Sequence, residues 1–136
     1  MKARRHSFGE HVGEVLLQME APTIRVLFEE AGLALAELLA ESVEDRSIGT
    51  EERVDLEERD HGALLVAWLN ELIFRSERTK LVYDDLRVDV RGTRLAAAIR
   101  GHRPRRARTA VKAATMHDVH VDEGQDGFSA SVVLDV

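Results

Sequence analysis

The chain has 136 residues, of which 44% are hydrophobic and 32% are charged, and its net charge at pH 7 is -6. This length and composition predict one globular domain over residues 1–136, with enough chain for a single hydrophobic core. The absence of cysteine excludes disulfides and thiolate chemistry, and no apolar run approaches the ~20 residues that cross a bilayer. We therefore expect a cytoplasmic protein that does not enter a membrane or coat nucleic acid by net charge.

The N-terminal third predicts a strand followed by a helix. Residues 12–19 are a short candidate strand. Residues 23–40 then place apolar side chains at helical spacing, with glutamates off the apolar stripe. The hydroxyl of Thr23 is suited to accept a free backbone N–H in the first turn of this helix.

The same order repeats in the middle of the chain. Residues 53–57 are a second candidate strand, and residues 61–76 form a second amphipathic pattern behind Asp60, a candidate cap. The only tryptophan, Trp68, lies on the apolar stripe and is expected to anchor the core, while Phe74 widens the stripe.

The remainder alternates with period two and predicts two hairpins. In the first, residues 86–90 and 95–99 flank a turn at Gly92. In the second, residues 116–121 and 128–135 flank a turn rich in Gly, Asp and Glu. The predicted fold class is α+β, a mainly antiparallel or mixed β-sheet with two amphipathic helices packed on one face.

Three acidic or imidazole features could carry chemistry. His11 lies between Glu10 and Glu14, so a metal site or proton sharing is conceivable there, although an exposed strand start is the simpler interpretation. Neighbouring strand residues point to opposite faces, so His117 and Asp118 are not expected to form a bidentate pair with each other. Each could still meet a residue across the sheet, although a solvated face is the simpler interpretation. At the end of the chain, the carboxylate of Asp135 lies beside the α-carboxylate of Val136, and such oxygen-rich groups suit hard divalent cations.

A fourth feature is an arginine-rich segment, which Gly101 and Pro104 place in a loop. Guanidinium groups match phosphate geometry, so this segment could bind RNA or a nucleotide phosphate. No aromatic residue accompanies them as a stacking platform, and a solvated basic loop is the alternative. The arginines are Arg100, Arg103, Arg105, Arg106 and Arg108.

Three segments, in order, resemble the archease family over almost the whole chain. Residues 11–15 (His-Val-Gly-Glu-Val) are similar to the family's His-Thr-Ala-Asp-Ile/Val motif. Residues 64–73 resemble its Leu-Leu-x-x-Trp-Leu-x-Glu-Leu-Leu pattern. Residues 111–118 and 132–136 resemble its Val-Lys-Ala-x-Thr-x-His segment and its Val-Leu-Asp-Ile/Val ending.

The resemblance implies an accessory protein that is not itself an enzyme. Archeases assist the RNA ligase that joins 2′,3′-cyclic-phosphate or 3′-phosphate ends to 5′-hydroxyl ends in tRNA splicing and RNA repair, by promoting its guanylylation and multiple turnover. The family's divalent-metal ligands correspond by position to Glu14, Asp135 and Val136. Calcium, magnesium or manganese would be the ion, with His11, His117 and Asp118 as supporting residues or partner surface.

Two segments depart from the family pattern. Glu14 stands where the family has aspartate, which sets the carboxylate about 1.5 Å further out, and Ca²⁺ tolerates this better than Mg²⁺. Residues 100–108 are arginine-rich where the family usually has Gly-Glu and later Asp and His. The alternative function is therefore an adaptor that binds RNA or protein through these arginines without a metal. A small enzyme with His117 and Asp118 as acid and base would lack a recognisable nucleophile.

Overall fold

The computed structural model describes residues 1–41, 43–45 and 49–136, and these contain two helices and eight strands. Within the described residues, neither helix combines the length and the apolar character needed to span a bilayer. In chain order the elements are β1 (Arg5–His11), β2 (Glu14–Ala21), α1 (Ile24–Leu39), β3 (Val43–Asp45), β4 (Glu51–Glu57), α2 (His61–Thr79), β5 (Val82–Arg91), β6 (Arg94–Pro104), β7 (Ala113–Gly124) and β8 (Gly127–Asp135).

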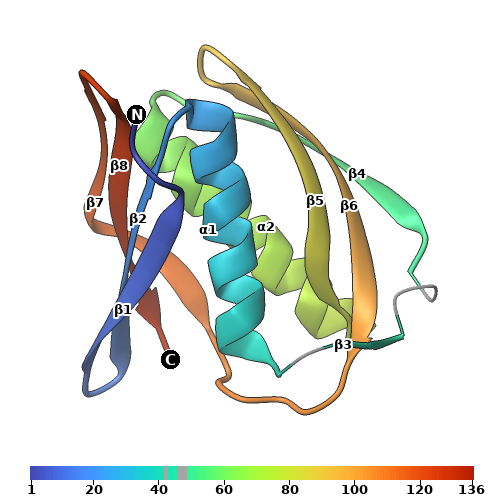
Figure 1. The fold of residues 1–136 in the computed structure, drawn as a ribbon. Coiled ribbons are helices and arrows are strands. Elements are labelled where there is room, and N and C mark those ends of the chain that lie inside the picture. Colours follow the sequence, from blue (N-terminus) through green and yellow to red (C-terminus); the bar gives the residue numbers. More distant parts are fainter. Residues whose placement is uncertain (42, 46–48) are drawn as a thin grey trace.

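The strands form two antiparallel sheets, with both helices between them (Figure 1). The first sheet has the order β1-β2-β8-β7, and in the second β6 pairs with β3, β4 and β5. Helix α1 contacts β2 and β5, and α2 contacts β7. The predicted α+β class, antiparallel pairing and two helices are confirmed. The strands divide into two sheets instead of one, so each helix is covered on two sides.

Helix α1 begins where the sequence predicts. The Thr23 hydroxyl accepts a hydrogen bond from the Val26 amide at 3.2 Å. The buried face includes Gly32, which lies against β5, and a Cβ placed there would be 2.4 Å from Leu86 Cδ1. Glycine at this position therefore sets how closely α1 approaches the second sheet.

Helix α2 confirms Asp60 as its N-cap, because the Asp60 carboxylate accepts from the Ala63 amide at 2.8 Å. Trp68 is fully buried, and its indole N–H donates to the Phe28 carbonyl of α1 at 2.9 Å. The prediction for Phe74 was wrong: it is 56% exposed, with the Arg78 guanidinium 5.1 Å from its ring centre. The buried face of α2 includes the neighbouring Leu72 and Ile73, and Phe74 lies outside that face.

The N-terminus contains a hairpin where the sequence predicted one strand over residues 12–19. Strand β1 pairs with β2, and the turn between them places Gly13 at φ +78°, a conformation that favours glycine. Val12 is fully exposed in this turn. Strand β1 is an exposed edge strand without the alternation of β2, which explains why the period-two pattern missed it.

Candidate functional site

The two acidic residues singled out at opposite ends of the sequence face each other in the first sheet. Glu14 opens β2, Asp135 closes β8, and the two are paired residues in the antiparallel register. The Val136 amide donates to the Gly13 carbonyl at 3.0 Å, and the Lys112 amide donates to the Asp135 carbonyl at 2.8 Å. These backbone bonds fix the ends of the strands, so both carboxylates lie on the same face of the sheet.

His11 extends this row by one strand. It is the register partner of Glu14 across the β1–β2 hairpin, so His11, Glu14 and Asp135 occupy one line across three strands. Figure 1 shows the β1–β2 turn and the C-terminus at the same end of the first sheet. We call His11, Glu14 and Asp135 the acidic row. It lies on the outer face of this sheet, which is turned away from the helices.

The acidic row brings two carboxylates together without a neutralising partner in the part of the chain that the structure describes. Neither Glu14 nor Asp135 has a side-chain partner among the described residues, and like charges at paired positions repel. Carboxylate oxygens are the donors that Ca²⁺ and Mg²⁺ prefer, so these two residues fit such an ion. However, no group of three or more His, Cys, Asp or Glu side chains within the described residues is placed to hold a metal.

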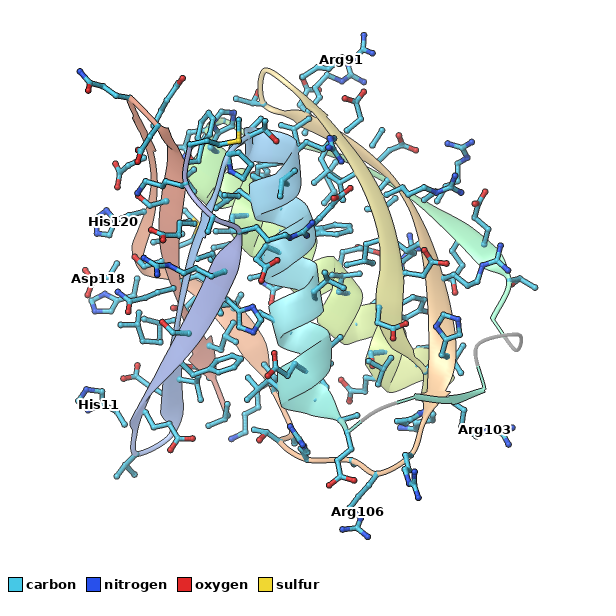
Figure 2. The ribbon with its side chains drawn as sticks, in the orientation of Figure 1. His11, Arg91, Arg103, Arg106, Asp118 and His120 are labelled. Carbon is cyan, nitrogen blue, oxygen red and sulfur yellow. The ribbon has the colours of Figure 1, made fainter. Side chains whose placement is uncertain are left out.

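His117 and Asp118 contact each other, contrary to the strand-alternation argument. The register between β7 and β8 shifts between Thr115 and His120, and Asp118 has φ +55°. This bulge breaks the alternation of side chains, and the His117 Nε2 lies 3.1 Å from the Asp118 carboxylate. Both side chains are more than two-thirds exposed, and Figure 2 shows Asp118 and His120 projecting from β7 into solvent. The pair is therefore a surface feature without an enclosed substrate site.

The arginine-rich segment is only partly a loop, so that prediction is corrected. Arg100 and Arg103 belong to β6, which continues to Pro104 because it pairs with β5 and with β3 there. Gly101 is a strand residue in close contact with its neighbours: a Cβ would lie 2.9 Å from the Tyr83 ring. Figure 2 shows Arg103 and Arg106 pointing outward at the same end of the molecule. Arg105, Arg106 and Arg108 follow in the exposed segment after β6.

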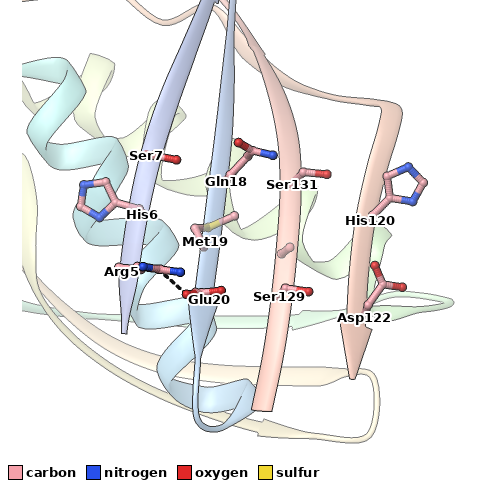
Figure 3. A pocket seen from close by; sticks show the side chains of 11 residues that line it. Arg5, His6, Ser7, Gln18, Met19, Glu20, His120, Asp122, Ser129 and Ser131 are labelled. Atoms are coloured by element: carbon pink, nitrogen blue, oxygen red, sulfur yellow. Dashed lines mark ion pairs between the residues drawn. The ribbon is translucent and has the colours of Figure 1, made fainter. Parts of the chain in front are cut away.

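A polar groove of about 480 Å³ crosses the outer face of the first sheet, which also carries the acidic row (Figure 3). Its centre is a row of register partners that runs Ser7, Gln18, Ser131 and His120. Figure 3 shows these side chains on one side of the strands, with the Arg5–Glu20 ion pair at the end of the groove. Sequence reasoning missed this groove, although the alternation in β2 and β8 carried the signal.

A charge cluster holds β1 on α1 from the inner side. The His6 imidazole lies between two carboxylates, with Nδ1 2.6 Å from Glu30 and Nε2 2.5 Å from Glu37, and Arg4 donates to Glu30 at 2.6 Å. Burial lowers the pKa of His6, but hydrogen bonds and charge attraction from the two glutamates outweigh it and raise that pKa. Burial likewise raises the pKa of Glu30, but His6 and Arg4 bring it below its ordinary value. The cluster fixes the strand that leads into the acidic row.

Known proteins resemble this chain over nearly its full length. The model of the archease protein family matches residues 6–136. Protein archease of Archaeoglobus fulgidus is 28% identical over 97% of this chain and 99% of its own. Protein archease of Thermococcus gammatolerans is 31% identical over 91% of this chain and 92% of its own.

Two solved structures share the fold. The solution structure of Methanobacterium thermoautotrophicum protein 1598 superposes with a TM-score of 0.74 at 23% identity, covering 96% of this chain and 98% of the other. A Thermotoga maritima crystal structure, described as "an archease, possible chaperone", gives a TM-score of 0.69 at 20% identity over 93% of this chain and 94% of the other. With the family model spanning both ends of the acidic row, the chain belongs to the archease family.

Proposed function

We propose that this protein is an accessory factor of an RNA ligase that joins 2′,3′-cyclic-phosphate or 3′-phosphate ends to 5′-hydroxyl ends. In this role it promotes guanylylation and multiple turnover of the ligase in tRNA splicing or RNA repair, and it performs no reaction alone. Family membership supports the accessory role. The single observation that carries the proposal is the direct pairing of Glu14 with Asp135.

The proposed site holds a divalent cation with Glu14, Asp135 and Val136. Bound there, the ion would supply positive charge beside nucleotide phosphates at the ligase active site. The protein's own contribution is to position these ligands. A hydrogen bond of 3.0 Å from the Val136 amide to the Gly13 carbonyl holds the end of β8 beside the β1–β2 turn. The longer side chain of Glu14 favours Ca²⁺, whose larger shell accepts irregular ligand geometry, over Mg²⁺.

The rest of the outer face fits a protein-docking surface around this site. His11 lies in the acidic row, and the exposed His117–Asp118 pair projects from β7 of the same sheet. The polar groove lies on the same face and extends to the Arg5–Glu20 ion pair at the other end of the sheet. We propose that this face contacts the ligase, with His11 and His117 as hydrogen-bonding groups.

The test is multiple-turnover ligation by the RNA ligase of the same organism, with and without this protein, in calcium, magnesium or manganese. We expect stimulation that is lost in Asp135→Asn and strongly reduced in Glu14→Gln. Asp55→Asn is the matched control, because Asp55 is an exposed strand carboxylate opposite Ala96 in the other sheet. Full stimulation by the Glu14→Gln, Asp135→Asn double variant would refute the metal role, and no stimulation by the native protein under any metal would refute the accessory role.

A further inference from the structure

A second groove, of about 580 Å³, opens where the ends of both helices meet the segment after β6. Ile73 of α2, Val82 of β5 and Val111 form its buried floor. Its walls are also aliphatic, and they consist of Leu39, Ala40, Pro104, Ala107 and Ala110. We call this the apolar groove. It shares no lining residue with the acidic row or with the polar groove.

The apolar groove exists because small residues leave space that the core does not fill. Ala36, Ala40 and Val82 form a hydrophobic cluster of their own, apart from the main core. Of these, Ala40 and Val82 also line the apolar groove, and a larger side chain in place of Ala40 would fill part of it. The chain thus keeps an apolar concavity open to solvent, which globular proteins commonly reserve for a binding partner.

The segment 106–109, of which residues 107–109 line the groove, is fixed by backbone hydrogen bonds to the end of α1 and to Glu41 just after it. The Glu41 amide donates to the Arg106 carbonyl at 2.8 Å, and the Arg108 amide donates to the Leu39 carbonyl at 2.8 Å. The Thr109 amide adds a bond to the Leu38 carbonyl at 3.2 Å. The apolar groove is therefore preformed, and a ligand would not have to order this segment.

The rim of the apolar groove is positively charged. Lys80, Arg108 and Lys112 line it, against one acidic residue, Glu77. Among the described residues, none of these three cations has an ion-pair partner. Unneutralised cations around an aliphatic floor are complementary to a ligand that carries both aliphatic and acidic side chains.

We propose that the apolar groove binds a segment of a partner protein in which Leu, Ile or Val side chains alternate with Asp or Glu. The aliphatic residues would occupy the floor and the acidic ones would meet Lys80, Arg108 and Lys112. RNA is the poorer fit, because no aromatic side chain of the described residues lines the groove for bases to stack on. The proposal does not require the metal, although the Lys112 end of the groove adjoins Asp135.

The test is selection of a random-peptide phage library on the immobilised full chain in EDTA, followed by fluorescence anisotropy with the enriched peptides. We expect enrichment of acidic-aliphatic sequences. Their binding should weaken by about tenfold or more in an Arg108→Glu, Lys112→Glu variant, through charge reversal at the rim. Ala110→Trp should also abolish binding by filling the groove at an exposed position, whereas Arg94→Glu, at the opposite end of β6, should bind normally.

Several results would overturn the proposal. They are the absence of acidic-aliphatic enrichment, and peptide binding that survives both groove variants. Binding of single-stranded RNA that Ala110→Trp abolishes, without peptide binding, would make the groove a nucleic-acid site. Self-association that Ala110→Trp abolishes in sedimentation would make the occupant a second copy of the chain. Because the peptide assay contains EDTA and no ligase, its failure is distinct from failure of the proposed ligase function.

Discussion

Glu14→Gln should change the stability of the protein in opposite directions with and without a divalent cation. Glu14 and Asp135 are paired across neighbouring strands. Side chains so placed start about 5 Å apart, where two unit charges repel by about 0.8 kcal/mol in water. Because Glu14 is exposed, screening reduces this repulsion, and we expect the variant to be more stable than wild type by about 0.2–0.8 kcal/mol in EDTA at low salt. The gain should shrink in high salt.

With a bound cation the order should reverse. A cation present at about tenfold excess over its dissociation constant stabilises the wild type by about 1.4 kcal/mol, and the variant by less, since it has lost one ligand charge. The assay is urea unfolding followed by circular dichroism, first in EDTA and then with calcium, magnesium or manganese. Asp135→Asn and the double variant complete a mutant cycle, and Asp55→Asn is the control. Additive effects in the cycle, together with equal cation-induced stabilisation of all variants, would refute the reasoning.

Four further predictions concern the scaffold. The stabilisation from His6 should be complete below its ordinary pKa of 6.5 and disappear as pH rises through its raised pKa, so urea midpoints at alkaline pH should fall in wild type but not in His6→Gln. On the acid side, the stabilisation from ionised Glu30 should be complete above its ordinary pKa of 4.5. It should be lost as pH falls through its lowered pKa, which a pH series of the same assay would show. Trp68→Phe should destabilise by about 2–4 kcal/mol in urea unfolding, because it removes core volume and the indole hydrogen bond to the Phe28 carbonyl. Phe74→Gln should stay within about 0.5 kcal/mol of wild type in the same assay, since Phe74 is 56% exposed.

Local sequence signals were enough for the helices. Thr23 and Asp60 both cap as expected, because capping depends on a side chain and an amide three residues away. The extents of the edge strand β1 and of β6 were harder to predict from the sequence. Strand β1 has no alternation to detect, and β6 continues through Gly101 because of its neighbours β5 and β3, which lie outside any local window.

The acidic row illustrates what local pattern cannot supply. The pairing of Glu14 with Asp135 depends on β8 inserting between β2 and β7, and nothing in either segment specifies that register. The resemblance to a family identified the two residues by position, and the structure supplied their pairing. The His117–Asp118 contact was misjudged because a bulge cannot be read from composition.

The place of β8 in the first sheet has a consequence for synthesis of the protein on the ribosome. Strand β8 follows β1, β2 and β7 in the sequence, yet it lies between β2 and β7 and supplies half of the acidic pair. Until it has emerged, β2 lacks one of its two partners, and the nascent chain exposes an unpaired edge. The pairing that creates the acidic row thus cannot form until β8 has emerged and inserted between β2 and β7.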